Sequence, residues 1–260
     1  MKSFIFKKVF NYSILASSLL LLLLGCRSPQ FTNTEVKTHY IEINETVQKN
    51  NQVDAFLKPY RDHINGDLSK ILSYNPEDLD KNSGKWQNPM TNFFADVVIE
   101  TGKPVFEKRI GKQIDFCLLN YGGIRANIAK GTITPRTAYE IMPFENSAIV
   151  LELKGTVLFE MADFILKNKT AHPLSNIEII ADKENLTVKD IKIRGISIDK
   201  NQTYYVITND YLAKGGDRMD FFLKANESYP LDYKLRNMFI AYFSETDTLK
   251  PSSQPRILFE

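Results

Sequence analysis

The most restrictive feature of the sequence is a short, nearly continuous apolar run at residues 114–119 (IDFCLL). A strand with one face in water alternates apolar and polar residues, whereas a strand that is covered on both faces has no such alternation. The run therefore predicts a strand buried between two packed layers. It contains Cys117, which we interpret as a small buried hydrophobic residue.

Around this run the sequence mixes helical and strand patterns without strict alternation. Apolar residues have helical spacing at residues 53–72, with Pro59 as a kink or break, around 93–98 with an end near 102–104, at 155–168 and at 230–244. Strand patterns occur at residues 147–154, 176–181, 190–194, 203–208 and 256–259, and weakly at 37–43. The mixture predicts an α+β fold, a mixed β-sheet flanked by helices.

Residues 1–25 have the pattern of an export signal. A basic start is followed by an apolar run at residues 9–24, shorter than the roughly 20 residues of a spanning helix, and by Leu-Leu-Gly-Cys at residues 23–26. This ending resembles the lipobox of bacterial lipoproteins, in which the cysteine, here Cys26, carries the lipid. The alternative is an uncleaved anchor with an incidental cysteine. Either way we expect an extracytoplasmic protein attached to a bacterial membrane, on its periplasmic or cell-surface face.

We therefore expect a lipoprotein signal peptide at residues 1–25, a tether and lead-in at 26–50 and a single domain at 51–260. Residues 1–25 hold three lysines and no acid, so the rest of the chain has 30 basic and 31 acidic residues. This balance provides no basic surface in bulk, and we expect no nucleic-acid polymer as a partner.

Four polar clusters contain residue types that can carry chemistry. They are residues 120–125 (NYGGIR), 143–146 (PFEN), 209–217 (NDYLAKGGD) and 90–96 (MTNFFAD). In the first cluster, glycines let the backbone approach a ligand closely, and the planar guanidinium of Arg125 suits a phosphate or carboxylate. Taken alone, however, a Gly-Gly pair after a strand is more often an ordinary turn.

The other three clusters have similar alternatives. Phe144 is either a core residue or an aromatic platform, and burial tendencies favour the core. Tyr211 and Asp217 can hold a flat ring and sugar hydroxyls, or they can belong to a polar turn. Asn92 lies at a helix start, where backbone N–H groups favour anions, and its alternative is an ordinary helix N-terminus.

Taken together, the clusters resemble the C-terminal, substrate-binding domain of bacterial and animal 5'-nucleotidases, a family that includes UDP-sugar hydrolases. The family motifs are Asn-x-Gly-Gly-Ile-Arg, Gly-x-Ile-Thr or Ser, Pro-Phe-x-Asn, an aromatic-x-Ala-x-Gly-Gly-Asp segment and an earlier Gly-Asn-Leu helix start. Here they correspond to residues 120–125, 131–134, 143–146, 211–217 and 91–93. The similarity runs from about residue 40 to the C-terminus.

The resemblance implies that the first motif faces the substrate phosphate. Arg125 and Asn120 would contact the phosphate or the bond that is hydrolysed. Gly122 and Gly123 would be substrate-binding residues as well.

The resemblance also implies roles for the later motifs. Phe144 and Tyr211 would sandwich the nucleobase, an arrangement that tolerates any base because every base has a π-face. Asp217 would accept hydrogen bonds from the ribose hydroxyls. Asn146 and Asn92 would lie at the rim of the pocket.

Two positions depart from the family pattern. The family usually has a basic residue that reaches the phosphate shortly before the helix start, and the matching position here is Trp86, with Lys85 beside it. Lys85 can replace the charge but not the bidentate geometry of an arginine. Arg218 stands where a third glycine is usual, so we expect a different loop backbone there.

In the family that the chain resembles, a separate N-terminal domain holds two metal ions, and a metal-activated water attacks the phosphate. This chain has three histidines, His39, His63 and His172, and none lies near a second metal-ligand motif. We therefore expect no catalytic residue and no metal or other cofactor in this chain, with divalent metal ions only on a partner chain.

Three hypotheses follow for function. The first is the nucleotide-binding half of a split 5'-nucleotidase, with a separate metallophosphatase protein hydrolysing the ester in nucleotide catabolism. The second is a stand-alone extracytoplasmic lipoprotein that binds a nucleotide or nucleoside without a catalytic partner. The third is a degenerate domain that serves as an interaction scaffold.

Overall fold

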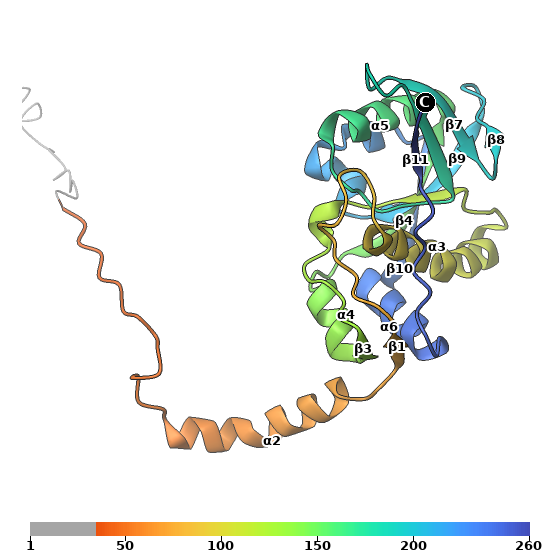
Figure 1. Cartoon of the computed structure of the whole chain (residues 1–260). Coiled ribbons are helices and arrows are strands. Elements are labelled where there is room, and N and C mark those ends of the chain that lie inside the picture. The colour runs from red at the N-terminus through yellow and green to blue at the C-terminus, as the bar shows by residue number, and fades with distance from the viewer. Residues whose placement is uncertain (1–34) are drawn as a thin grey trace, which may run out of the picture. The chain divides into compact units, whose positions relative to one another are not determined.

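The computed structural model describes residues 35–260, and a five-stranded mixed sheet organises them (Figure 1). In order across the sheet, its strands are β10 (Glu227–Lys234), β4 (Ser147–Lys154), β9 (Thr203–Asn209), β2 (Phe116–Leu118) and β5 (Leu174–Ser175). Strands β2 and β9 are parallel, and the other neighbours are antiparallel. The predicted fold, a mixed sheet flanked by helices, is confirmed.

Strand β2 is buried on both faces, as its apolar run predicts. Phe116, Cys117 and Leu118 are all 0% exposed. Because successive side chains of a strand point to opposite faces, Cys117 packs into the core on one side of the sheet, and its two neighbours pack into the core on the other side. The paired strand is shorter than the predicted run, which also includes the loop residues on either side.

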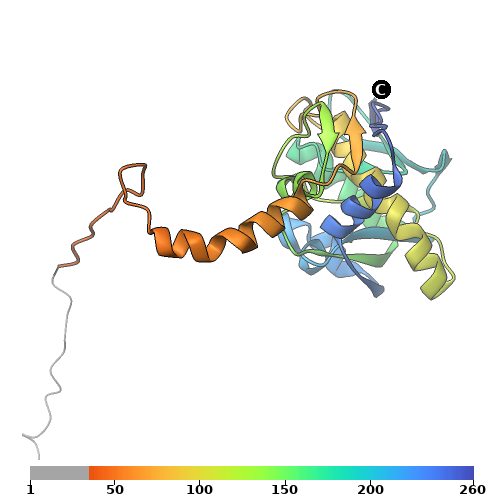
Figure 2. The same ribbon diagram turned by 90° about the horizontal axis from the view of Figure 1, so that it is seen from below.

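Two helices cover one face of the sheet. They are α3 (Pro89–Ile110) and α6 (Leu235–Glu245), which Figure 2 shows next to each other in yellow and blue. Their contact is aromatic, with the ring centroids of Phe94 and Phe239 4.5 Å apart. Burial of such large rings is a major source of folding free energy.

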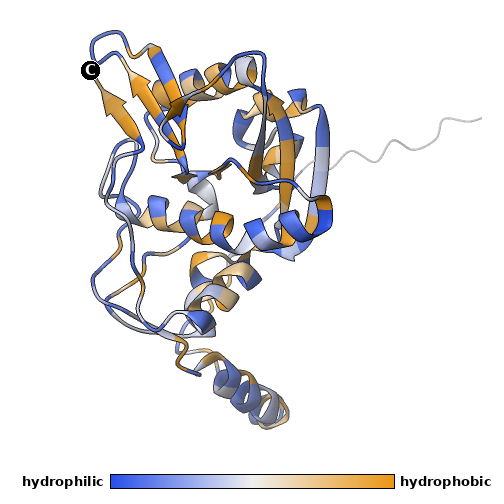
Figure 3. Cartoon of the chain, turned by 90° about the vertical axis from the view of Figure 1, so that its right-hand side faces the viewer, coloured by the Kyte–Doolittle hydropathy of each residue, from blue (hydrophilic) through white to orange (hydrophobic). Residues whose placement is uncertain are grey.

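The other face is covered by one helix and a second sheet. The helix is α5 (Gly155–Asn168), and the four-stranded sheet has the order β11 (Ile257–Phe259), β6 (Ile177–Ala181), β7 (Val188–Ile193) and β8 (Ile196–Ser197). Apolar residues dominate β6 and β11, which appear largely orange in Figure 3. Leu158 and Ile165 of α5 share a core with Ile179 of β6 and Val206 of β9.

Helix α3 does not end near residues 102–104, as the sequence pattern predicts, but continues to Ile110. Pro104 has no backbone N–H, so the carbonyl of Glu100 lacks its usual hydrogen bond within the helix. Helix α3 tolerates this loss because Glu100 is exposed and water can bind its carbonyl. Gly102 lets α3 pack closely against β9, because a Cβ at this position would lie 2.3 Å from Cδ1 of Ile207. The helix ends where Gly111 adopts a left-handed conformation with φ 73°.

The predicted helix at residues 230–244 begins later, because its first part belongs to β10. Tyr229, Leu231 and Tyr233 alternate along β10 and pack against the α3–α6 core. Pro230 is tolerated because β10 is an edge strand. The weak strand pattern at residues 37–43 was also misleading, since these residues form no strand and are exposed.

Several short elements near the loops of the main sheet have no clear sequence pattern. Strand β1 (Ser73–Asn75) pairs with β3 (Gly131–Ile133), and α4 (Pro135–Ile141) follows. Thr134 and Thr137 form a capping box at the start of α4. The described residues also include four 3-10 turns, η1 (Tyr121–Gly123), η2 (Leu212–Lys214), η3 (Gly216–Arg218) and η4 (Asp220–Lys224).

The predicted helix at residues 53–72 is present as α2 (Asn51–Leu68), and Pro59 lies inside it. No residue of α2 is buried. Residues 52–260 form one compact unit, and residues 35–51 belong to a separate one. No helix in residues 35–260 has the length and apolarity needed to cross a membrane. The predicted signal and the lipid site Cys26 lie outside the described residues.

Candidate functional site

Eight of the nine predicted binding residues line one cavity of about 360 Å³. The loops that carry them follow β2, precede β4 and follow β9. Because β9 is parallel to β2 and antiparallel to β4, the carboxyl ends of β2 and β9 and the amino end of β4 share one edge of the sheet. The lining residues are Asn120, Gly122, Gly123, Arg125, Phe144, Asn146, Tyr211 and Asp217.

Asp217 is the centre of a polar network in this cavity. Its Oδ2 accepts a hydrogen bond from Nδ2 of Asn120 at 2.7 Å, and its Oδ1 accepts one from the hydroxyl of Tyr211 at 2.8 Å. The bond to this carboxylate raises the pKa of Tyr211, because an ionised tyrosine has no proton to donate. The network fixes the carboxylate and leaves further lone pairs for a ligand.

The ring of Tyr211 lies directly over Gly216. A Cβ at Gly216 would lie 2.5–2.7 Å from three ring atoms, so only glycine permits this arrangement. The side chain remains 45% exposed, which leaves ring surface available for stacking.

The backbone at Asp217 and Arg218 is left-handed, with φ of 54° and 61°. Residues other than glycine rarely adopt this backbone conformation, which costs roughly 1–2 kcal/mol per residue. Arg218 therefore has a backbone conformation that favours glycine, the residue usual at this position in the family pattern. The different loop backbone expected at Arg218 stays a prediction. Strained residues of this kind cluster at binding sites.

The guanidinium of Arg125 lies 5.6 Å from the ring centroid of Phe144. Both side chains are exposed, Phe144 to 42%. The guanidinium has no hydrogen-bond partner among residues 35–260, whereas the backbone N–H of Arg125 is held by the carbonyl of Ile141 at 3.0 Å. Its donors are therefore available to an anion while its backbone is fixed.

Sequence reasoning missed Arg236, which supports the Phe144 loop from α6. Its buried guanidinium donates to the carbonyl of Phe144 at 3.4 Å, forms an ion pair with Glu145 and lies 4.3 Å from the ring centroid of Tyr139. The only sign of this role in the sequence is that Arg236 is a single cation within the apolar pattern of α6.

Sequence reasoning also missed Lys81. Its Nζ donates to the carbonyl of Ile124 at 2.5 Å and lies 4.2 Å from the ring centroid of Tyr121. This contact places Lys81 at the residue that precedes Arg125 in the chain. Burial lowers the pKa of Lys81, and so does the positive charge of Arg125. Lysine in a polar loop is too common to be singled out from the sequence.

Trp86 and Lys85 do not replace the missing basic residue at this cavity. The indole of Trp86 donates to the carbonyl of Leu166 at 3.2 Å and packs against Phe259, with 4.7 Å between centroids. Lys85 lies over the indole, 5.1 Å from its centroid.

Asn92 is the predicted binding residue that does not line the cavity. It is 2% exposed, and its amide donates to the carbonyls of Ser252 and Gln254, each at 3.0 Å. These bonds hold the C-terminal segment against α3. The expectation that Asn92 lies at the pocket rim was wrong, because its amide is occupied within the fold.

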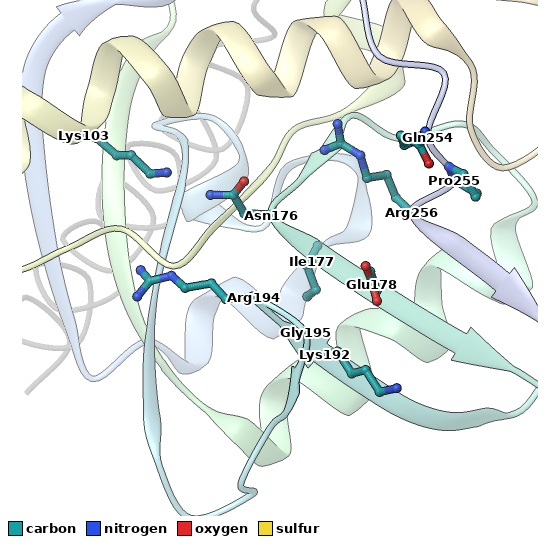
Figure 4. Close-up of a pocket in the computed structure, with 10 residues that line it drawn as sticks. All are labelled: Lys103, Asn176, Ile177, Glu178, Lys192, Arg194, Gly195, Gln254, Pro255 and Arg256. Carbon is teal, nitrogen blue, oxygen red and sulfur yellow. The ribbon is translucent and has the colours of Figure 1, made fainter.

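A second cavity, of about 440 Å³, includes Lys103, Arg194 and Arg256 among its lining residues (Figure 4). Its arginines already have acidic partners, since Arg256 binds Asp96 at 2.8 Å and Arg194 contacts Asp115 at 3.5 Å. None of its lining residues is aromatic. The first cavity, with free guanidinium donors and two exposed rings, is therefore the candidate site.

The described residues do not fit a two-metal centre. Residues 35–260 contain no group of three or more His, Cys, Asp or Glu side chains that could hold a metal ion. His39 is exposed, and the exposed His63 lies 3.6 Å from Asp67. His172 is buried, and its Nδ1 accepts the backbone N–H of Tyr121 at 3.2 Å.

Comparison with known proteins supports one family. The family model described as "5'-nucleotidase, C-terminal domain" matches residues 69–224. The chain is 27% identical over 209 residues to the trifunctional nucleotide phosphoesterase protein YfkN of Bacillus subtilis, covering 74% of this chain and 14% of that protein. It is 22% identical over 215 residues to the protein UshA of Escherichia coli, covering 81% of this chain and 36% of UshA.

Solved structures share the fold. The 5'-nucleotidase precursor from Thermus thermophilus superposes with a TM-score of 0.67 at 21% identity, covering 80% of this chain and 43% of that one. The NAD nucleotidase of Haemophilus influenzae gives a TM-score of 0.60 at 18% identity, covering 81% and 42%. This chain thus spans less than half the length of these relatives. The match over residues 69–224 and the shared fold show that the chain belongs to the 5'-nucleotidase C-terminal domain family.

Proposed function

We propose that the cavity binds a nucleotide, and that this chain is the substrate-recognition half of a split 5'-nucleotidase in nucleotide catabolism. A separate metallophosphatase chain would carry the divalent metal ions and hydrolyse the ester. The observation that supports the proposal is the convergence of Arg125, Phe144, Tyr211 and Asp217 on one cavity.

Each part of a nucleotide has a counterpart in this cavity. The half-exposed rings of Phe144 and Tyr211 offer stacking surfaces to a nucleobase. The carboxylate of Asp217 is an acceptor for ribose hydroxyls, and Asn120 and Tyr211 hold it in place. The free guanidinium of Arg125 offers paired donors to phosphate oxygens, and Lys81 adds positive charge nearby.

The residues of this chain would bind and orient the substrate. A fixed carboxylate and a ring seated on Gly216 reduce the entropy lost on binding, because they need not be ordered by the ligand. We assign no bond-breaking step to residues 35–260, because they provide no set of ligands for two metal ions.

We also infer that the protein is exported and held at a bacterial membrane by a lipid on Cys26, so that it would meet extracytoplasmic nucleotides. Metabolic labelling with a fatty acid tests this directly. The wild-type protein should incorporate label and the variant Cys26→Ala should not. Equal labelling of both would contradict the assignment of Cys26.

The experiment that tests the functional proposal mixes the purified protein with purified secreted metallophosphatases of its source organism and follows AMP hydrolysis. We expect at least one mixture to exceed the sum of its two components. If the protein binds AMP but no mixture gains activity, the stand-alone nucleotide-binding lipoprotein is the better description. If the protein binds neither AMP nor adenosine, the domain is better described as an interaction scaffold.

A further inference from the structure

Helix α2 presents an apolar surface that no other part of its unit covers. We call it the α2 arc: Phe56, Leu57, Tyr60 and Ile64, with exposed fractions of 68, 43, 59 and 55%. At 100° per residue these positions lie within an arc of about 100° on one side of the helix. Apolar patches of this kind on a helix surface mark sites of interaction.

The acidic and basic side chains of α2 are paired within the helix. Lys58 pairs with Asp62 at 2.5 Å, and Arg61 pairs with Asp54 at 2.9 Å. An amphipathic helix gains most of its stability from packing its apolar face against other groups. Packing a partner against the α2 arc would therefore stabilise the helix more than packing one against its charged side.

The charge of α2 argues against a lipid surface as that partner. Interfacial helices that bind anionic lipids carry lysine and arginine on the polar face. In α2 the acids Asp54, Asp62 and Asp67 outnumber the bases Lys58 and Arg61.

The position of α2 in the chain indicates a protein partner. The matched family segment begins at residue 69, directly after Leu68, where α2 ends. The family is named as a C-terminal domain. The alignments with UshA and with the Thermus thermophilus nucleotidase precursor cover 81% and 80% of this chain and span 36% and 43% of those two chains. The additional part of such relatives adjoins the domain on its N-terminal side, where α2 lies in this chain.

We propose that the α2 arc is the surface on which the separate metallophosphatase chain docks, an inference that rests on the proposed function. The partner would cover Phe56, Tyr60 and Ile64 with a complementary apolar surface. Large aromatic side chains at the centre of such a patch usually contribute most to affinity.

The test is the triple variant Phe56→Ala/Tyr60→Ala/Ile64→Ala. Alanine has the highest helix propensity, and these side chains contribute to no core, so the helix and the domain should remain folded. The matched control is Lys58→Ala/Asp62→Ala, which alters the opposite side of the same helix. Affinity is measured by surface plasmon resonance against each purified secreted metallophosphatase of the source organism, and AMP binding is measured by calorimetry.

We expect the triple variant to bind the partner about 100-fold more weakly than the wild type, with the control within about threefold and AMP affinity unchanged in both. If the partner binds the triple variant as tightly as the wild type, the docking inference is wrong and the split enzyme stands. If no metallophosphatase associates with the wild type, both the docking inference and the split enzyme fall. Sedimentation that shows a wild-type dimer, lost in the triple variant, would instead assign the arc to a second copy of the chain.

Discussion

Tyr211 and Asp217 are joined by two hydrogen bonds that run in opposite directions. The hydroxyl of Tyr211 donates to Oδ1 of Asp217 at 2.8 Å and accepts the backbone N–H of the same residue at 3.1 Å. The aromatic ring and the carboxylate are thus held as one unit, six positions apart in the sequence. In our account this unit presents a stacking surface and a ribose acceptor together.

This coupling predicts different results for two substitutions of Tyr211. Tyr211→Phe keeps the ring and loses both hydrogen bonds, so adenosine affinity should fall by about 1 kcal/mol. Tyr211→Ala also removes the stacking surface and should cost a further 1–3 kcal/mol or so. Calorimetry with adenosine measures both. Equal affinities for the two variants would show that the ring does not contact the base.

Gly216→Ala should weaken adenosine binding by roughly the stacking contribution, about 1–3 kcal/mol, although it adds only a methyl group. The new Cβ would lie 2.5–2.7 Å from ring atoms of Tyr211 and force the ring to move. Gly66→Ala is the matched control, because nothing lies within 4 Å of its Cβ position in the exposed helix α2. Wild-type adenosine affinity in Gly216→Ala would contradict the placement of the ring.

Asn92→Ala should lower the free energy of unfolding by about 1–3 kcal/mol and leave AMP affinity unchanged. The reason is that the carbonyls of Ser252 and Gln254 lose their common donor inside the fold. Urea denaturation and calorimetry separate the two effects. If Asn92→Ala weakened AMP binding without lowering stability, Asn92 would be a binding residue after all.

His172 should make the protein less stable in acid. Burial lowers its pKa from 6.5 to about 4, while the charge of Asp217 acts in the opposite direction. Between these values the unfolded chain binds the proton and the folded chain does not. The contribution of His172 to stability is therefore complete above pH 6.5 and is lost as the pH falls towards 4, by about 3 kcal/mol in total.

Urea denaturation at a series of pH values measures this effect. His172→Gln should lose stability less steeply between pH 6.5 and pH 4 than the wild type does. His63→Gln removes an exposed imidazole from α2 and is the control for losing a histidine as such. Identical pH dependence in the wild type and His172→Gln would assign the acid sensitivity to other groups.

Elements with a strong local pattern were predictable to the residue. The pattern at 147–154 corresponds to β4 and that at 155–168 to α5, because each has clear periodicity and the two adjoin at Lys154 and Gly155. Elements whose identity depends on distant neighbours were not. Residues 230–234 belong to a strand because β4 lies beside them, which no local pattern reveals.

The site shows the same division. The motif residues gather because β2, β4 and β9 place their loops at one edge, and eight of the nine line the cavity. Lys81 and Arg236 support the same loops from distant segments, and their residue types carry no local signal. Asn92 has the right motif position, but its amide faces the C-terminal segment, an arrangement that only the tertiary structure determines.

The most direct test of a nucleotide site is the comparison of AMP and adenosine in the wild type and in Arg125→Ala. Arg125 has a free guanidinium beside Phe144, and a charged hydrogen bond to phosphate contributes about 1.5–3 kcal/mol. Lys85→Ala is the control, because Lys85 lies over Trp86 and not at the cavity. We predict that the wild type binds AMP more tightly than adenosine, and that Arg125→Ala loses this difference and keeps its adenosine affinity. Equal losses for AMP and adenosine, or no binding of either by the wild type, would contradict the account.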